Sequence, residues 1–378
     1  MKIAYTENQA AVQKAAREFV TRELLPYADS FDMEQEVPRH VIQKVAQEGY
    51  LTPMIPQTYG GLELDAIAVG CLNEEVGRAC SSIRSLLTVH GMVSLALLKW
   101  GSSGQKDRWL PLLTSGKAIA AFGLSEENAG SDVQGIQTRA ERIGEDVLIN
   151  GSKKWITFGQ IADLYLVFAK LEDKPAVFLV DRATSGLTVT PIRNILGTRG
   201  SMLAELKFEN CRVSMDHLIG AVGTGLSHVA SSCLDYGRYS IAWGSVGSAQ
   251  ACLEASIDYT RSRKQFGKHL NEQQLIQKML TEMIVAIKSA KLLCCKAGYL
   301  RDKGEPEAIM ETWIAKYAAS KAFSSVTASA VQLHGAYGIS AESPVERHFR
   351  DARIIEIIEG TSQMHEIQIG SNAIRFYQ

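Results

Sequence analysis

The sequence shows no excess of charge of either sign. Its 378 residues include 40 Lys and Arg and 41 Asp and Glu, so the formal net charge is −1. A nucleic-acid-binding domain would carry a basic excess, so we expect no nucleic-acid partner. No internal repeat and no low-complexity tract is visible in the sequence.

The cysteine spacings that mark metal sites are also missing. The chain has an odd number of cysteines, with no CxxC motif and no Cys/His ligand spacing. We therefore expect reduced thiols in a cytoplasmic protein, and no metal site. The seven cysteines are Cys71, Cys80, Cys211, Cys233, Cys252, Cys294 and Cys295.

Long apolar segments are lacking as well. Met1–Phe19 is amphipathic and charged, unlike the apolar core of a signal peptide. No run approaches the roughly 20 apolar residues of a membrane span. We expect a protein with no membrane partner.

The sequence does contain enough apolar residues, 46%, to bury a core in two or three domains. The pattern of apolar residues and glycines divides the chain into a helical domain over 1–118, a β domain over 119–222 and a helical bundle over 223–378. Apolar spacing predicts helices over Gln9–Tyr27, Val37–Glu48, Leu64–Ala79, Ser85–Trp100, Asp107–Leu113, Leu226–Ser262, Asn271–Lys303 and Glu307–Leu333. β-rich runs predict strands over Val147–Ile149, Leu164–Phe168, Ala176–Val180, Leu187–Pro191 and Ala204–Phe208.

Two segments of the middle domain could hold a cofactor. Phe122–Ser125 is followed by Ala129–Asp132, a turn whose backbone N–H groups could hold a phosphate or a ring edge. Asn150-Gly151 is a hairpin-turn signal before Trp155 and Thr157, which could contact a planar ring. Taken singly, an ordinary loop and a core tryptophan explain these segments equally well.

The helical part carries three further segments. Arg261–Lys268 has four cations and one aromatic residue, which could bind a pyrophosphate or simply end a helix. Gln332–Gly338 is a glycine-rich turn, compatible with an ordinary helix end. Glu359 follows the apolar run Ile354–Ile358, where its pKa should rise enough to make it a general base. A surface Glu capping the next helix is the alternative.

These five segments, in this order and at these separations, resemble the acyl-CoA dehydrogenase family over nearly the whole chain. The resemblance implies an α+β fold with an N-terminal α-helical domain, a middle β-barrel-like domain and a C-terminal four-helix bundle. It implies FAD as cofactor, an acyl thioester as substrate and Glu359 as the base that takes the α-proton. Family variants place the base where Gly237 stands here, so Glu359 has no rival.

The resemblance also assigns contacts by position. Trp155 and Thr157 should flank the flavin ring, with Thr157 near the nitrogen that accepts hydride. Arg263, Phe266, Gln332 and Gly335 should bind the adenine half of a neighbouring subunit's FAD, which implies a homodimer or homotetramer. The remaining expected FAD contacts are Phe122, Leu124, Ser125, Gly130, Ser131, Thr361 and Gln363.

For the substrate, the resemblance assigns Asp235, Gly237 and Arg238 to the pantetheine channel. Ser85, Thr88, Val89 and His90 should face the flavin and Glu359, with the Ser85 and Thr88 hydroxyls on one helix face. An oxygenated acyl group would need such polar partners. A helix histidine bonded to a backbone carbonyl is an equal reading of His90.

Three segments resemble a narrower group, the dehydrogenases of hydroxymalonyl- or methoxymalonyl-acyl carrier protein extender units, with an aminomalonyl-related group beside it. They are Ala79–Ser85, Tyr236–Gly244 and Glu356–Gly360. Ser125-Glu126-Glu127 and Phe158 depart from the usual family pattern and argue against a fatty-acyl substrate. A short-chain acyl-CoA dehydrogenase of catabolism and a flavin-free scaffold or docking module are the alternatives. An electron-transfer flavoprotein or another acceptor should receive the electrons.

Overall fold

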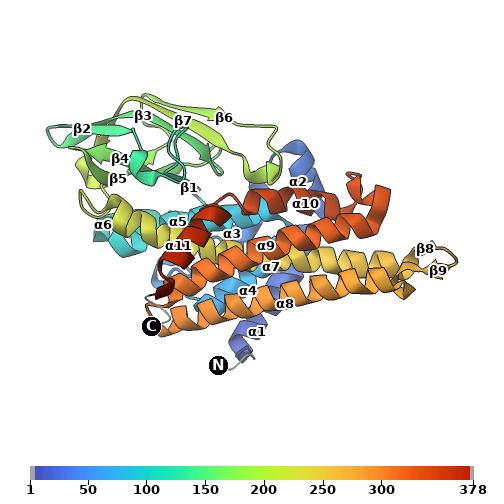
Figure 1. The fold of residues 1–378 in the computed structure, drawn as a ribbon. Coiled ribbons are helices and arrows are strands. Elements are labelled where there is room, and N and C mark those ends of the chain that lie inside the picture. Colours follow the sequence, from blue (N-terminus) through green and yellow to red (C-terminus); the bar gives the residue numbers. More distant parts are fainter. Residues whose placement is uncertain (1–4, 375–378) are drawn as a thin grey trace.

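The computed structural model describes residues 5–374; the first four residues of Met1–Phe19, and residues 375–378, lie outside the described part. Helices from both ends of the chain form one body, and the sheet of the middle region lies against one side of it (Figure 1). This helix–sheet–helix order confirms the fold class predicted from the sequence.

The N-terminal region is helical, as predicted. Its first helix starts with a capping box, in which Thr6 and Gln9 bond each other's backbone N–H groups. The helices are α1 (Glu7–Glu23), α2 (Ala28–Glu34), α3 (Arg39–Gln47), α4 (Ala66–Ala79), α5 (Ser81–Trp100) and α6 (Ser103–Thr114).

Helix α5 is the one described helix that is long and apolar enough to cross a membrane by length and composition, with a mean hydropathy of 1.3 over its most apolar window. The sequence analysis did not single it out. In the structure 89% of that window is buried inside the protein. The apolar composition of α5 reflects its place in the core between other helices.

The middle region forms a seven-stranded mixed sheet in the order β1-β4-β2-β3-β7-β6, with β5 paired to β4. Strands β1 and β2 each run parallel to β4, and the other pairs are antiparallel. Strand β4 is buried along almost its whole length, because one of its faces packs against the helices and the other against neighbouring strands of the middle region. The strands are β1 (Ala120–Gly123), β2 (Arg139–Ile143), β3 (Asp146–Ile156), β4 (Leu164–Leu171), β5 (Lys174–Asp181), β6 (Leu187–Pro191) and β7 (Ala204–Ser214).

The predicted hairpin turn at Asn150-Gly151 was wrong. The chain turns between β2 and β3 at Gly144, and Asn150 lies within β3, where the pairing with β7 shifts register. The Asn150 side chain bonds Asn210 across that irregularity. Gly151 has φ 138°, and a Cβ there would lie 2.7 Å from the Cα of Thr138. The Asn-Gly pair therefore forms a β-bulge, which needs the same backbone freedom as a turn.

The C-terminal region packs long helices around α7, the most central of them. Helix α7 contacts α4, α5, α8, α9 and α10. A π-helical turn, Gly225–Ala230, precedes it, so the regular helix starts five residues after the predicted Leu226. The elements are α7 (Ser231–Ser262), β8 (Lys264–Gln265), β9 (Lys268–His269), α8 (Gln274–Lys303), α9 (Ala308–His334), α10 (Pro344–Ile355) and α11 (Ser362–Ser371).

Glycines allow other groups to approach α7 closely. A Cβ at Gly247 would lie 1.8 Å from the backbone oxygen of Glu74 in α4. Cβ atoms at Gly237 and Gly244 would collide with the side chains of Glu359 and Arg84. These glycines are needed for close contact rather than for an unusual backbone angle, since a helix gains stability from almost any other residue.

All seven cysteines are free, and six of them are buried. Burial raises the pKa of every one of these thiols; the value is about 12 for Cys71 and Cys233. Among residues 5–374, no group of three or more His, Cys, Asp or Glu side chains is arranged to hold a metal ion.

Replacing Gly247 should destabilise the whole helical body. In Gly247→Ala the new methyl group meets a backbone atom that cannot move without separating α4 from α7. We expect a loss of about 3 kcal/mol or more in the free energy of unfolding. Gly104→Ala is the matched control, because nothing lies within 4 Å of a Cβ at that exposed helical position. Chemical denaturation of both variants checks the prediction; equal stability would contradict it.

Candidate active site

The predicted base, Glu359, lies in a strained turn between α10 and α11. Its φ is 54° and that of Gly360 is 94°, so two successive residues are left-handed. This conformation costs a non-glycine residue about 1 kcal/mol or more. The Thr361 hydroxyl accepts a hydrogen bond from the backbone of Met364 and caps α11 directly after the turn. The turn therefore re-aims the chain and points the Glu359 side chain inward.

Two buried cations hold this turn by its carbonyl groups. The Nε of Arg238, on α7, donates to the backbone oxygen of Glu359 at 3.1 Å. The Nζ of Lys316, on α9, donates to the backbone oxygen of Gly360 at 2.7 Å. Hydrogen bonds to charged donors contribute about 1.5–3 kcal/mol, enough to offset the backbone strain.

The Glu359 carboxyl group packs directly on Gly237 of α7. A Cβ at Gly237 would lie 2.4 Å from Oε2 of Glu359, so a side chain there would displace the carboxyl group. That oxygen is buried and has no hydrogen-bond partner within the described chain. Burial raises the pKa of Glu359 to about 7, against the opposing charges of Arg238, Lys316 and Arg84. Such a carboxylate can accept a proton near neutral pH.

Arg84, on α5, is a cation that the sequence analysis did not select. Its side chain is almost wholly buried, and its guanidinium donates to the Thr88 hydroxyl at 2.9 Å and to the Ser85 hydroxyl at 2.8 Å. Among residues 5–374 it forms no ion pair with a carboxylate. Burial lowers its pKa to about 10, so it stays charged at neutral pH.

This arrangement corrects the predicted polar wall on α5. The Ser85 and Thr88 hydroxyls were expected to be free for substrate, but both accept from Arg84 and donate to backbone oxygens one turn earlier. The Thr88 hydroxyl also meets that of Ser240 at 2.6 Å. Val89 is buried in the core cluster. The polar group that these residues present is therefore the Arg84 guanidinium.

His90 joins the helices to the sheet and does not offer a free polar group. Its Nδ1 accepts from the backbone N–H of Ala120 in β1, so its protonated Nε2 donates to the carbonyl of Leu113. Burial lowers its pKa to about 4, which keeps it neutral. The prediction that His90 faces the flavin and Glu359 was wrong, and the alternative reading, a satisfied structural histidine, is confirmed.

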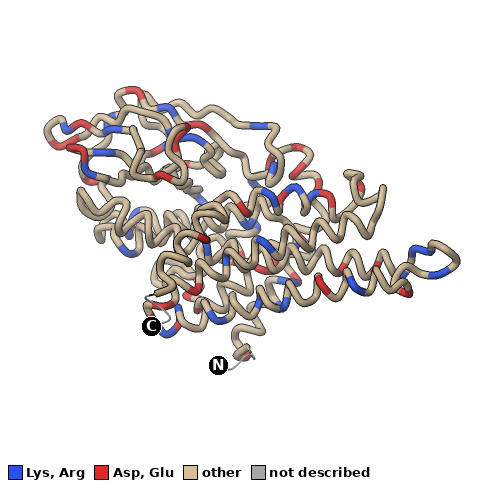
Figure 2. The backbone as a smooth tube through the Cα atoms, in the orientation of Figure 1, with Lys and Arg blue, Asp and Glu red and all other residues tan. Residues whose placement is uncertain are grey.

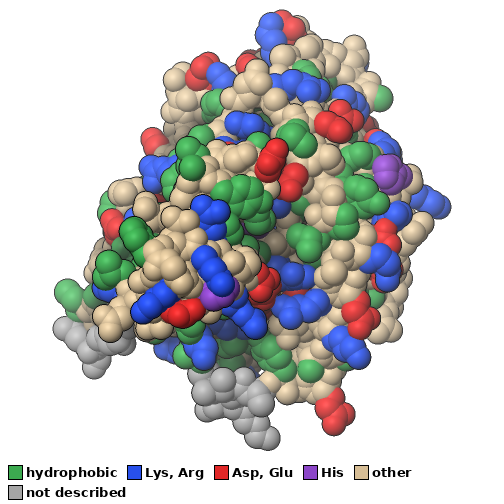
Figure 3. Space-filling view, turned by 90° about the vertical axis from the view of Figure 1, so that its right-hand side faces the viewer, with side chains coloured by type: hydrophobic (Ala, Val, Ile, Leu, Met, Phe, Trp, Pro, Cys, Tyr) green, Lys and Arg blue, Asp and Glu red, His purple; other side chains and the backbone are tan. Residues whose placement is uncertain are grey.

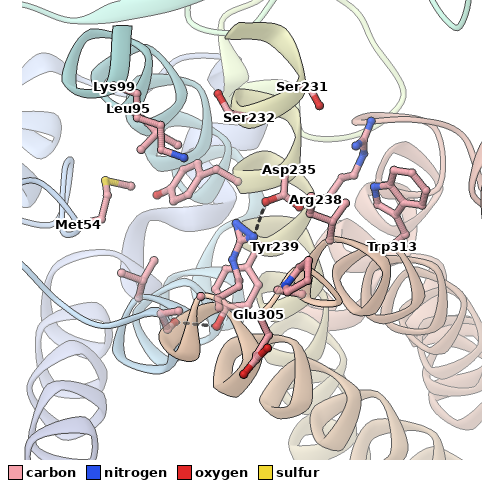
Figure 4. Close-up of a pocket in the computed structure, with 18 of the residues that line it drawn as sticks. Met54, Leu95, Lys99, Ser231, Ser232, Asp235, Arg238, Tyr239, Glu305 and Trp313 are labelled. Atoms are coloured by element: carbon pink, nitrogen blue, oxygen red, sulfur yellow. Dashed lines mark hydrogen bonds and ion pairs between the residues drawn. The ribbon is translucent and has the colours of Figure 1, made fainter. Parts of the chain in front are cut away.

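A cleft of about 650 Å³ opens beside this site between α5, α7 and the α8–α9 connection (Figure 4). Asp235 and Arg238 of α7 line it, facing Trp313 of α9. Asp235 pairs with Arg301, while its Oδ1 is buried without a partner in the described chain. The Arg238 guanidinium thus reaches from the cleft to the Glu359 turn, so the cleft leads toward the base.

Several predicted FAD contacts come together at the edge of the sheet. The backbone N–H of Lys154 donates to Ser125 at 2.9 Å, which holds the end of β1 beside Trp155. Leu124 packs in the core cluster that includes Tyr236, next to Gly237 on α7. One continuous apolar core therefore connects this edge of the sheet with α7, the helix on which Glu359 packs.

The exposed groups at this edge fit a planar cofactor with phosphates. Trp155 has φ 65° and is 51% exposed, so its indole is open to a ligand. Thr157 is partly buried two residues later. Gly130 and Ser131 are exposed, and a Cβ at Gly130 would meet nothing within 4 Å, which leaves space for a ligand. Phe122 is tilted against Phe168 in the sheet core.

A buried ion pair missed by the sequence analysis shapes this edge. Glu126 accepts from the Nζ of Lys153 at 2.6 Å and from the backbone N–H groups of Gln137 and Thr138. Lys153 also donates to the carbonyl of Leu124. The loop after β1, which contains predicted FAD contacts, is thus held to β3 by a buried ion pair.

The residues predicted to bind the FAD of a neighbouring subunit lie away from this edge of the sheet. Arg263 and Phe266 belong to the β8–β9 hairpin, which projects from the end of the bundle, and Phe266 is 97% exposed (Figure 1). Gln332 and Gly335 are exposed at the end of α9, where Tyr259 stacks on His334. Lys and Arg residues gather at this hairpin (Figure 2), and Lys and Arg side chains cluster on the face of the molecule that Figure 3 shows. The arrangement leaves these residues pointing outward.

Thr361 and Gln363 follow the base at the start of α11. Thr361 is partly buried because its hydroxyl caps the helix, and Gln363 is exposed. Both lie on the chain segment that carries Glu359, so a cofactor contacted by Gln363 would be held next to the base.

Comparison with known proteins decides the family. Models of the N-terminal, middle and C-terminal domains of acyl-CoA dehydrogenases match residues 6–117, 121–211 and 223–374. The chain belongs to the acyl-CoA dehydrogenase family. It is 38% identical to the human mitochondrial short-chain specific acyl-CoA dehydrogenase, over 98% of this chain and 91% of that protein. This acyl-CoA dehydrogenase is therefore an oxidoreductase acting on acyl thioesters, with FAD as cofactor, which excludes a flavin-free scaffold.

Solved structures include both CoA and carrier-protein enzymes. Butyryl-CoA dehydrogenase from Megasphaera elsdenii has a TM-score of 0.95 at 32% identity, covering 99% of this chain and 100% of that one. The prolyl acyl carrier protein oxidase AnaB has 0.93 at 30%, covering 98% and 100%. FkbI, for biosynthesis of a methoxymalonyl extender unit, has 0.87 at 31%, also covering 98% and 100%.

Replacing Glu359, the predicted base, should almost abolish flavin reduction by substrate. Glu359→Gln keeps the shape of the side chain but cannot accept a proton, which usually costs about 10²–10⁴ in rate. In the unmodified enzyme the rate should rise with pH through about 7, because the deprotonated carboxylate is the active form. Anaerobic stopped-flow bleaching of the flavin measures both effects.

Glu356→Gln is the matched control, since that carboxylate pairs with Lys321 and Arg353 at the surface instead of facing α7. Its rate should stay close to that of the unmodified enzyme. A Glu359→Gln variant within a few-fold of the unmodified rate would move the base to another residue.

Proposed function

We propose that the chain oxidises a small, oxygenated acyl thioester of the kind used for hydroxymalonyl-type extender units, presented on an acyl carrier protein. The observation that carries this proposal is Arg84. A buried cation is costly unless it is paired, and this one has hydroxyl groups but no carboxylate for partners among the described residues. A substrate oxygen or carboxylate would supply the missing acceptor.

The geometry along α7 supports a short acyl group. Glu359 packs on Gly237 and Arg84 packs on Gly244. These two glycines lie on one face of α7, two turns and about 10.5 Å apart along the helix axis. The Arg84 guanidinium folds back to Thr88, which meets Ser240, one turn from Gly237. The Glu359 carboxyl group and the Arg84 guanidinium are therefore separated by a distance closer to one helical turn than to two. Such a distance suits a three-carbon acyl group better than a long chain.

Glu359 and Arg84 have different roles in the proposed reaction. Glu359 takes the proton, either from the α-carbon of a saturated acyl group or from a hydroxyl of the hydrate of a C3 aldehyde. Bound FAD supplies the two-electron acceptor. In the second case the C3 hydrate loses one hydride and one proton and becomes a carboxylic acid. Arg84 would then bind and orient the C3 oxygens, and its charge favours the carboxylate that forms.

The cleft is proposed to hold the pantetheine arm, with Gly237 allowing the thioester to reach Glu359. Asp235 has an unpartnered buried oxygen that can accept an amide N–H of the arm, and Arg238 lines the path to the base. CoA and a carrier protein share this arm. The similarity to AnaB and FkbI favours the carrier protein.

A short-chain acyl-CoA dehydrogenase of catabolism is the second candidate. The observation in its favour is the 38% identity to the human short-chain enzyme over almost the whole chain. In that case Glu359 removes an α-proton, and the cleft holds the pantetheine of CoA. Either enzyme would act in the cytoplasm and pass electrons to an electron-transfer flavoprotein or another acceptor.

Substrate preference separates the two candidates through Arg84. Arg84→Met keeps side-chain length, and Ser85 and Thr88 still donate to backbone oxygens after the change. We expect activity on glyceryl-type thioesters to fall roughly ten- to a hundred-fold, the value of a hydrogen bond to a charged group, with little change on butyryl thioesters. Steady-state assays with each acyl group on CoA and on carrier protein measure this, at a pH well above 7, where Glu359 is ionised with or without the Arg84 charge.

Arg108→Met is the control, because Arg108 lies at the surface over the ring of Trp109. It should change neither substrate's rate. Equal losses on both substrates with Arg84→Met, or a preference of the unmodified enzyme for butyryl-CoA, would favour the catabolic candidate.

We also propose that Arg263 and Phe266 bind the FAD of a neighbouring subunit in a homodimer or homotetramer. Their exposed hairpin is otherwise unexplained, and Arg263 is suited to a phosphate. Arg263→Ala should release FAD on dilution and weaken the oligomer together, while Lys174→Ala, at an exposed turn of the sheet, should do neither. Flavin absorbance and analytical ultracentrifugation test this; full flavin occupancy in Arg263→Ala would contradict it.

A further inference from the structure

Lys316 is a buried amine in the middle of α9 that holds the Glu359 turn without touching the carboxyl group. Its side chain has no exposed surface, and among residues 5–374 its ammonium group donates only to the backbone oxygen of Gly360, at 2.7 Å. A lysine buried for structural reasons usually pairs with a carboxylate. Lys316 instead binds the carbonyl directly after the catalytic base.

The charges around this amine come from five elements. Glu359 is the opposite charge with the largest influence on it, followed by Arg238 from α7. The groups that face Lys316 or the Glu359 carboxyl are Arg84 from α5, Arg238 from α7, Lys321 from α9, Glu356 after α10 and His365 from α11.

His365 stays neutral in this group. Its Nδ1 lies 2.9 Å from the carbonyl oxygen of Thr361, and burial lowers its pKa to about 4. The positive charges that face Glu359 at neutral pH are therefore those of arginines and of Lys316. Of these, Lys316 alone can lose its charge near neutral pH, since burial lowers its pKa to about 7.

The contact with Gly360 fixes where this charge lies. The carbonyl it binds belongs to a left-handed glycine, so its direction follows from the turn that aims Glu359 inward. Breaking this bond would free the turn, and removing the charge would leave the Glu359 carboxylate with one fewer cation. The hydrogen bond and the charge can be separated by a substituted side chain that keeps the bond to the Gly360 carbonyl but carries no charge.

We propose that Lys316 is a positioning residue, which holds the Glu359–Gly360 turn and sets the pH at which Glu359 becomes a base. This inference rests on the proposed catalytic role of Glu359. A positive charge beside a carboxylate favours its deprotonated form, so Lys316 extends the activity of the enzyme to lower pH. Because both pKa values lie near 7, Lys316 loses its proton over the same pH range in which Glu359 does, and the two titrations are coupled.

The test compares Lys316→Met, which removes bond and charge, with Lys316→Gln, which can still donate to the Gly360 carbonyl. In both variants the titration midpoint of Glu359 should move up by roughly one pH unit, because the cation that opposed burial is gone. Lys316→Gln should keep flavin reduction at high pH close to that of the unmodified enzyme. Lys316→Met should lose rate at all pH values.

Two measurements follow the midpoint. One is the pH dependence of flavin reduction under anaerobic conditions. The other is the infrared absorption of the protonated Glu359 carboxyl group, identified by its loss in Glu359→Gln, which titrates whether or not Glu359 is the base. An infrared shift without a base role for Glu359 would therefore leave the electrostatic part standing and overturn the proposed function alone.

Lys321→Met is the matched control. Lys321 is on the same helix and has the same charge, but it is partly exposed and pairs with Glu356 at 3.2 Å. Water screens such a charge, so the midpoint should not move. An unchanged infrared midpoint in Lys316→Gln would overturn the proposal. If Lys316→Met fails to fold, the midpoint of Lys316→Gln decides.

Discussion

The close approach of other groups to α7 is the constraint on which the rest of the structure depends. Side chains at Gly237, Gly244 or Gly247 would push away the Glu359 turn, Arg84 or α4. Because α7 touches five other helices, a shift at one contact would be felt at the others. The same helix therefore determines the packing of the core and the spacing between base and cation.

The placement of the charges around Glu359 determines whether it can accept a proton. Three cations surround one carboxylate, yet none of them forms a hydrogen bond with its oxygens; Arg238 and Lys316 bind the main chain and Arg84 binds hydroxyls. A direct ion pair would hold Glu359 ionised and satisfied, and make it a poor base. Binding the cations elsewhere keeps the carboxylate charged but still able to accept a proton.

The sequence predicted the fold class and the family, because helical periodicity and the order of motifs are properties of the chain itself. It did not predict the role of Asn150-Gly151, since a bulge and a turn need the same residues. Ser85 and Thr88 were selected for their hydroxyl groups, while Arg84, the residue directly before Ser85, was overlooked. Its role depends on Gly244, which is 160 residues away in the sequence. Lys316 was missed for the same reason, as nothing in a helix sequence shows which lysine meets a distant carbonyl.

The six buried cysteines have a consequence for how long the protein can function. Thiolates react with oxidants and electrophiles, and burial both hides these sulfur atoms and keeps them protonated. A redox enzyme whose turnover moves electrons close to its own side chains gains from having no reactive thiol nearby. Damage at these residues would have to wait for the core to open, so the chemical lifetime of the molecule is tied to its rate of unfolding.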